Sequence, residues 1–456
     1  MPLRSDPALI ALHRFGFGAG AGELAQALAR PQAFVRDQLA RPAPLSRSDL
    51  PASDQALREQ RKFALVREDE RKRMASSEPT ASDKPLPPTA EQMLYRDEAA
   101  VRFAAFAASP TPFIERLVLF WTNHFAISLN KGPALRASIG AFEREAIRPH
   151  VLGRFTDMLQ AVEQHPAMLL FLDNENSTGP QSRTGAAGKR GLNENLAREI
   201  LELHTLGVDG GYGQEDVTSL ARILTGWTVT NREDDLFYGG RFTFSPVRHE
   251  PGAQTVLGKT YAQEDVAQGR AALADLATHP ATARHLARKL ARHFLADEPP
   301  QTLVARLEVA FKASNGDLMS VTRALVDAPE CWSAPLTKIR SPQLFLAALL
   351  RAAPRKPEVG ALLSHLILMG QPFWNPPDPS GWPDIERAWA SPEGMSVRLD
   401  IAAFWGRLNS GVDPLALLDQ TFGPSASAQT RQAIARAESR AQGLALAFMS
   451  PEFQRC

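Results

Sequence analysis

The sequence has little cysteine, no long hydrophobic run and almost no net charge. Its cysteines are Cys331 and Cys456, and no CxxC pair is present, which excludes zinc-ribbon and thioredoxin-like proteins. No stretch reaches the ~18 apolar residues that a transmembrane helix needs. The first twenty residues lack the apolar core and the small-residue cleavage site of a secretory signal. We therefore predict no membrane span, and the absence of a visible signal peptide favours the cytoplasm.

The charge balance argues against a polyanionic partner. A formal net charge of +1 over 456 residues gives no electrostatic reason to expect binding to nucleic acid or to an anionic membrane. Hydrophobic residues make up 44% and charged residues 22% of the chain, as in an ordinary globular protein. A chain of this length buries enough surface to fold without disulfides or a structural metal.

Helical periodicity runs through most of the chain, so we predict a mostly α fold in one large multi-helix domain, 1–456. The segment 241–258 alternates as RFTF, is interrupted by Pro and Gly, and resumes as TVLG, which predicts a small β-hairpin. The domain could thus consist of an N-terminal helical lobe (1–240) and a second lobe (241–456) that contains the hairpin and the C-terminal helices. Residues 74–89 hold four prolines and are predicted to form a flexible internal loop.

A polar helix is predicted at 193–206, directly after a long glycine-rich loop. Helical spacing places Asn195, Glu199 and Glu202 on one stripe and His204 on another. Two carboxylates one turn apart can hold a hard metal ion, or act as general acid and base if their environments separate their pKa values. The alternative is a structural network of ion pairs and helix caps.

The remaining polar residues of this helix fit either interpretation. Asn193 is the expected N-cap. Arg198 and Glu202 are neighbours by i, i+4 spacing, and Arg198 could also orient a carboxylate or an anionic substrate. His204 completes the polar set as a binding candidate.

A second candidate is the pair Asn123–His124, which closes an apolar helix among aromatic residues. A desolvated imidazole favours its neutral form and suits a base or a metal ligand; the alternative is a core histidine bonded to the backbone. His124, Glu199 and Glu202 are therefore the predicted catalytic residues. The same three would be the ligands if the cofactor, which the sequence does not identify, is a divalent metal ion.

Weaker binding candidates lie elsewhere in the chain. They are Trp227, His249 at the tip of the predicted hairpin, and Trp382 in the proline-rich loop 371–383. Trp382 could stack on a sugar or a partner, or only anchor its loop. The basic helix at 280–296 is expected to present a solvated face.

Several motifs match one family pattern over nearly the whole chain. They are HRFGFGA (13–19), ERLVLFWTNHFAIS (115–128), AVEQHPAMLLFLDNENSTGP (161–180), GLNENLAREILELHTLGVDGGYGQEDV (191–217), ARILTGWT (221–228), TVLG (255–258), HPATARHLARKLARHF (279–294), MGQPFWNPPDPSGWP (369–383) and MSPEFQR (449–455). In these segments the chain resembles the bacterial domain-of-unknown-function 1800 family. The resemblance implies no particular activity. Because many members look exported and are encoded beside another family of secreted proteins, it implies a protein partner and a periplasmic location, although this chain shows no export signal.

Two hypotheses about function arise from these residues. The first is an enzyme with a carboxylate/histidine site on the 193–204 helix, performing acid–base chemistry or metal-assisted hydrolysis on an unknown substrate. The second is a non-catalytic scaffold or binding protein that acts with a partner protein, with the Trp382 loop as its contact surface. A glycan-active enzyme is less favoured, because two carboxylates on adjacent turns differ from a pair that flanks a sugar bond.

Overall fold

The structure, a computed structural model, describes residues 6–41, 45, 49–75, 88–188, 191–230 and 239–456. Within these ranges the chain forms 23 α-helices and two antiparallel sheets of two strands each, which confirms the mostly α fold. No helix in the described ranges is long and apolar enough to cross a membrane. Most of the predicted flexible loop at 74–89 lies outside the described residues.

The helices before the strands begin in most cases at a proline or a capping residue, where a missing or side-chain-bonded N–H is tolerated. They are α1 (Pro7–Leu9), α2 (Glu23–Ala29), α3 (Pro31–Arg36), α4 (Ser53–Ala75), α5 (Ala90–Ala108), α6 (Pro112–His124), α7 (Pro133–Phe142), α8 (Phe155–Glu163), α9 (Pro166–Phe171), α10 (Asn195–Glu199) and α11 (Gln214–Leu224). Three π-helical turns interrupt this part: η1 (Ile10–Arg14), η4 (Glu143–Ile147) and η8 (Ile200–His204). The 3-10 turn η5 (Arg148–His150) comes directly after η4.

The helices after the strands begin in the same way. They are α12 (Val266–Thr278), α13 (Pro280–Phe294), α14 (Gln301–Ala313), α15 (Leu318–Val326), α16 (Pro329–Ser333), α17 (Pro342–Ala352), α18 (Val359–Leu368), α19 (Pro392–Leu408), α20 (Pro414–Phe422), α21 (Ala428–Ala435), α22 (Arg440–Met449) and α23 (Pro451–Gln454).

The strands form two separate pairs. β1 (Trp227–Val229) pairs with β2 (Phe242–Phe244), and β3 (Gln254–Val256) pairs with β4 (Lys259–Tyr261). The β3–β4 hairpin turns at Leu257 and Gly258, whose φ angles of 51° and 75° match the left-handed pair of residues that a tight hairpin needs. The small hairpin is thus confirmed at 254–261, but the predicted RFTF strand pairs back with β1 instead of with TVLG.

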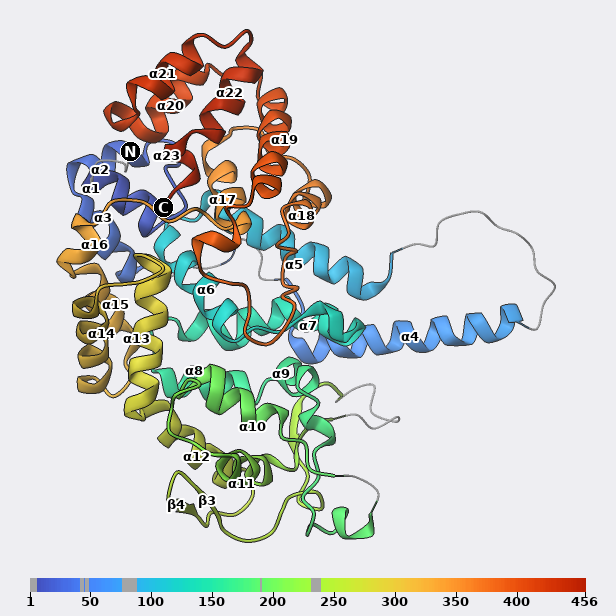
Figure 1. The fold of residues 1–456 in the computed structure, drawn as a ribbon. Helices are drawn as coiled ribbons and strands as arrows, with labels where there is room; N and C mark the ends of the chain where they lie inside the picture. Colours follow the sequence, from blue (N-terminus) through green and yellow to red (C-terminus); the bar gives the residue numbers. More distant parts are fainter. Residues whose placement is uncertain (1–5, 42–44, 46–48, 76–87, 189–190, 231–238) are drawn as a thin grey trace.

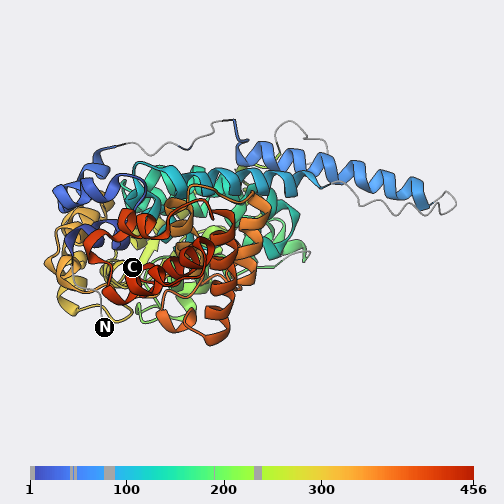
Figure 2. The same cartoon turned by 90° about the horizontal axis from the view of Figure 1, so that it is seen from above.

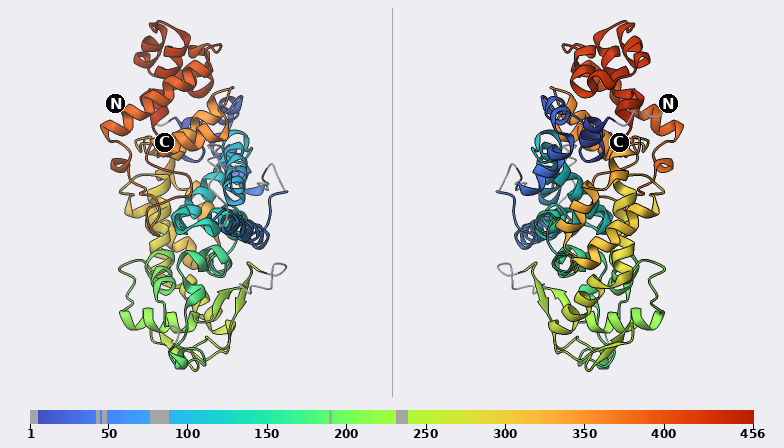
Figure 3. Two further views of the ribbon diagram at one scale, coloured as in Figure 1. Left: turned by 90° about the vertical axis from the view of Figure 1, so that its right-hand side faces the viewer. Right: turned by 90° about the vertical axis from the view of Figure 1, so that its left-hand side faces the viewer.

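The helices form an elongated body with α6 near its middle (Figure 1). Helices α19 to α22 lie at one end, and the strands with α10 to α12 lie at the other, as the side views also show (Figure 3). Helix α4 packs on α7 and then extends away from the body (Figure 2). The predicted lobe boundary after residue 240 falls between β1 and β2, which are paired with each other.

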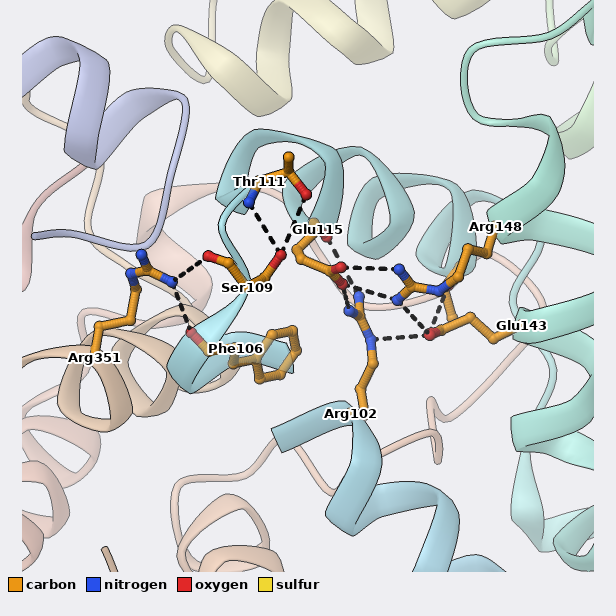
Figure 4. Close-up of polar contacts among 9 residues, drawn as sticks. Arg102, Phe106, Ser109, Thr111, Glu115, Glu143, Arg148 and Arg351 are labelled. Carbon is orange, nitrogen blue, oxygen red and sulfur yellow. Dashed lines mark hydrogen bonds and ion pairs between the residues drawn. The ribbon is translucent and has the colours of Figure 1, made fainter. Parts of the chain in front are cut away.

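Helix α6 is fixed by a buried network of ion pairs (Figure 4). The carboxylate of Glu115, in its first turn, accepts hydrogen bonds from both terminal nitrogens of Arg148 at 2.8 Å and also binds Arg102 of α5. Arg102 Nε lies 2.9 Å from an oxygen of Glu143. Burial opposes ionisation of Glu115, but the two arginines outweigh it and hold its pKa below the usual value. The network joins α5, α6, η4 and η5 around α6.

Replacing Glu115 with glutamine should destabilise the fold strongly. Glu115→Gln leaves two buried guanidinium groups with only Glu143 as a carboxylate, a change that typically costs ~3–5 kcal/mol. Because the folded pKa is lowered, the stabilisation by Glu115 is present above its unfolded pKa of about 4.3 and is lost as pH falls through the folded value. Urea unfolding of both proteins at pH 7 and near pH 4 measures this difference.

The matched control is Glu68→Gln in α4, because Glu68 pairs with Lys72 on the exposed part of that helix. We expect its unfolding midpoint to equal that of the parent protein. Equal midpoints for Glu115→Gln and Glu68→Gln would contradict a stabilising role for the network.

Candidate functional site

The histidine at the end of α6 meets the end of the predicted polar helix. His124 Nε2 lies 3.1 Å from the carbonyl oxygen of His204, 80 positions away in the chain. Because a carbonyl oxygen can only accept, Nε2 carries the proton and Nδ1 holds a free lone pair. His124 and the 193–204 helix therefore converge, which the sequence could not establish.

His124 is held in its neutral form. Its side chain is 1% exposed, and burial lowers its pKa well below the usual value, with the charges of Lys289, His285 and His204 acting in the same direction. In the part of the chain that the structure describes, no group donates a hydrogen bond to His124 Nδ1. The imidazole is thus an unprotonated base at neutral pH.

His204 is oriented by a carboxylate that the sequence did not single out. Its Nδ1–H donates to an oxygen of Glu163 at 2.8 Å, and both side chains are almost fully buried. Glu163 ends α8, an amphipathic helix with other polar residues, so no local motif marks it. The rings of His124, His204 and His285 lie together, with centroids 6.2–6.3 Å from that of His124.

A π-helical turn changes the stripes predicted for the polar helix. Helix α10 gives way to η8 at Ile200, and Thr205 Oγ1 donates to the Ile200 carbonyl at 2.6 Å. A π-turn adds a residue to one turn and rotates the later residues about the helix axis. The separation of His204 from Glu199 expected for a regular helix therefore no longer applies. The charge of His204 in fact acts on Glu199.

Glu199 is half-buried and has a raised pKa. Burial is the largest cause, and the negative charges of Glu202 and Asp378 add to it, while His204 and Arg198 oppose it. Glu202 is also half-buried. The surroundings of Glu199 therefore favour its protonated form.

Two other predicted residues of the helix, Arg198 and Asn193, bond to neighbouring residues of the chain. Arg198 pairs with Glu194 at 3.1 Å and donates to the side-chain oxygen of Gln214 at 3.1 Å. Asn193 precedes Glu194, the N-cap, so the prediction that Asn193 is the N-cap is wrong by one residue. Its side-chain oxygen nevertheless accepts the backbone N–H of Asn195 at 2.8 Å, and Asn195 itself is exposed.

A cavity of about 290 Å³ opens beside His124. Its walls are α6, α13 and the loop at 377–384. The lining residues are Phe120, Asn123, His124, Lys289, Arg292, Pro377, Asp378, Ser380, Gly381, Trp382, Pro383 and Asp384.

Two hydrogen bonds of the Asn123 side chain hold the loop that lines this cavity. Its amide oxygen accepts from the backbone N–H of Trp382 at 2.7 Å, and its amide nitrogen donates to the Trp382 carbonyl at 2.9 Å. The neighbouring Gly381 has φ +81°, and a Cβ there would lie 2.4 Å from the Asn123 carbonyl oxygen. Only glycine fits this approach. Asn123 and Trp382, both predicted binding residues, thus shape the cavity together.

Lys289 and Arg292 bring positive charge to the cavity from α13. Burial lowers the pKa of Lys289 to about 8, with Asp384 opposing the shift and Arg292 adding to it. One turn earlier, His285 Nε2–H donates to the Leu203 carbonyl at 3.1 Å, and burial lowers its pKa to about 4. The expectation of a solvated basic face at 280–296 is wrong for this side of the helix, which lines the site.

Asp384 is already neutralised by its neighbours. Burial opposes its ionisation, but His293 Nδ1 at 2.7 Å and Lys338 Nζ at 2.8 Å hold its pKa far below the usual value. This cluster ties the loop to α13 and gives Asp384 a structural role.

Trp227 and His249 lie outside the cavity. Trp227 is fully buried in β1, where its ring closes on Gly269 so tightly that a Cβ there would be 2.4 Å away. His249 Nδ1–H donates to the Thr225 carbonyl at 2.9 Å. Both belong to the packing of the strand region.

The predicted metal ligands do not form a metal site. Among the residues that the structure describes, no group of three or more His, Cys, Asp or Glu side chains is placed to hold a metal ion. His124, Glu199 and Glu202 therefore do not meet as a ligand set.

The comparisons with known proteins identify a family. The chain matches the family described as "Protein of unknown function (DUF1800)" over residues 10–455, and it belongs to that family. No curated protein matches significantly. No solved structure matches significantly either.

Truncating the Asn123 side chain should loosen the loop. Asn123→Ala removes two hydrogen bonds and leaves the Trp382 backbone unpaired, which costs about 1–3 kcal/mol. Asn123→Asp keeps the acceptor, so its free energy of unfolding should lie between those of the parent protein and Asn123→Ala. Asn130→Ala, at an exposed position, should leave the free energy of unfolding unchanged. Urea unfolding measures the series; a stability of Asn123→Ala equal to that of Asn130→Ala would refute a role of these hydrogen bonds in holding the loop.

Proposed function

We propose that this member of the DUF1800 family is an enzyme that catalyses proton-transfer chemistry, such as hydrolysis, on a small polar substrate bound between α6, α13 and the 377–384 loop. One observation carries the proposal: His124 donates Nε2–H to the His204 carbonyl at 3.1 Å and lines a cavity of about 290 Å³. A concave site with buried, perturbed titratable groups is the usual setting of acid–base catalysis.

The two proton-transferring groups have opposite protonation preferences. The pKa of His124 is lowered well below its usual value, so its ring is neutral at pH 7 and the unpaired Nδ1 can accept a proton. The pKa of Glu199 is raised, so its carboxyl can hold a proton and deliver it to a leaving group. Environments that push two pKa values apart in this way assign base and acid roles.

Positive charge beside the cavity supports the same chemistry. Arg292 lines it, and a fixed cation stabilises negative charge that develops on a substrate in a site shielded from water. Glu163 orients His204, whose backbone carbonyl in turn fixes the His124 ring. Glu163 is therefore a positioning residue.

Loss of either proton-transferring group should slow turnover strongly. Purified protein is incubated with a bacterial metabolite extract, and mass spectrometry follows compounds that are consumed and formed. We expect His124→Gln and Glu199→Gln to slow conversion by about 10²-fold or more.

The control for this assay is Glu215→Gln, an exposed position of α11, which should retain full rate. Folding of each variant is checked by its melting curve. Undiminished conversion by both folded variants would refute the assignment, and no conversion by the parent protein would favour the non-catalytic binding alternative.

The rate at which the substrate is converted should depend on pH through His124 and Glu199. Protonation of His124 at low pH removes the base, and deprotonation of Glu199 at high pH removes the acid, so kcat/KM should follow a bell. Glu199→Asp should keep the high-pH limb but shift it, and Glu199→Gln should remove it from the residual rate. A residual profile identical to that of the parent protein would contradict the role of Glu199.

A further inference from the structure

Lys289 stands out among the lysines near the cavity because it is unpaired. Within the described ranges it makes no ion pair or hydrogen bond, although it lines the cavity together with His124 and Arg292. Lys338, the nearby lysine, provides the contrast: its amine donates to the carbonyls of Arg292 at 2.7 Å and Asp384 at 3.0 Å and pairs with the Asp384 carboxylate at 2.8 Å. Lys338 therefore has hydrogen-bond and ion-pair partners, and it pairs with the Asp384 carboxylate, the acidic group that opposes the pKa shift of Lys289.

The groups around Lys289 favour a free amine. On its own helix, Arg292 adds a like charge and His285 is neutral at pH 7. From α6, His124 is neutral as well. From the loop, Asp384 is paired with Lys338, and Asp378 accepts hydrogen bonds from the backbone and hydroxyl of Ser380. Partial burial beside another cation is the setting in which lysines act as nucleophiles.

We propose that Lys289 is a nucleophile that forms an imine with an anionic carbonyl compound, such as a 2-oxo acid, bound in this cavity. The inference rests on the proposed function and names its substrate class. The unprotonated amine attacks the carbonyl carbon, a proton moves from nitrogen to the carbonyl oxygen, and loss of water leaves a C=N bond. Arg292 binds the carboxylate of the substrate. A proton from solvent goes to the departing hydroxyl, and the proton left on nitrogen returns to solvent. Hydrolysis of the imine restores the amine, so no oxidant or reductant is consumed.

Reductive trapping tests the nucleophile without requiring turnover. The full-length protein is treated at pH 7 with glyoxylate, an aldehyde that carries a carboxylate, in the presence of cyanoborohydride, which reduces any imine to a stable amine. Peptide mass spectrometry gives the labelling rate of each lysine. At pH 7 an amine of pKa about 8 is ~10% unprotonated, against ~0.04% for an ordinary lysine. Lys289 should therefore label on the order of tenfold or more faster than Lys312, whose side chain is 45% exposed.

Two variants and a second probe make the test specific. Lys289→Arg should remove the fast label and leave the Lys312 rate unchanged. Arg292→Gln should slow labelling of Lys289 by glyoxylate several-fold more than labelling by the uncharged glycolaldehyde, which reports any change in the pKa of Lys289. Labelling of Lys289 no faster than that of Lys312 overturns the proposal. Equal effects of Arg292→Gln on both probes overturn the anionic substrate class.

The trapping experiment and the conversion assay can fail independently of each other. If trapping fails while conversion of a metabolite still depends on His124 and Glu199, only the imine is refuted. If Lys289 traps rapidly while Glu199→Gln leaves conversion unchanged, the nucleophile stands and the acid–base assignment falls.

Discussion

The buried ion pairs around Glu115 are the constraint on which the site depends. Two arginines and two glutamates lie together almost without solvent, and such charges are tolerated only while each remains paired. Glu115 lies in the first turn of α6, where a negative charge also favours the helix dipole. The last turn of the same helix carries Asn123 and His124. Fixing one end of α6 therefore fixes the position of the groups at the other.

Burial has different effects on the ion pairs around Glu115 and on the groups around the cavity. Around Glu115 every charge has a partner, so burial is offset and the glutamate stays ionised. Around the cavity, Lys289 lacks an ion-pair partner in the described ranges and His124 Nδ1 lacks a donor. Burial there is not offset, and it lowers the pKa values of both groups. Rigidity thus comes from the cluster in which every charge is paired, and the lowered pKa values come from the groups that lack partners.

The loop at 377–384 completes the cavity by contacts that are distant in sequence. Asn123 holds the backbone of Trp382, while Lys338 and His293 hold Asp384. Trp382 is thereby a wall of the cavity, half-buried, with its backbone engaged. The prolines of the loop predicted only that it would be irregular.

Local pattern predicted the parts of the site that differ from their surroundings in sequence. His124 stood out as a polar residue closing an apolar helix, and Glu199 as part of a polar run. Glu163 and Lys289 could not be found in this way. Glu163 ends an amphipathic helix like any surface acid, and Lys289 lies in a basic stripe. An amphipathic pattern shows which face of a helix is polar, but not whether that face meets solvent or a cavity.

The amino-acid sequence by itself determined the helical class, the family, and the polar helix and histidine that belong to the site, because these depend on periodicity and composition within short segments. Only the tertiary structure decided that His124 meets His204, that a π-turn redirects the helix after Ile200, and that Lys289 remains without an ion pair in the described ranges. Each of these depends on a partner far away in the chain. Burial, and with it each pKa, is a property of packing that no single segment contains.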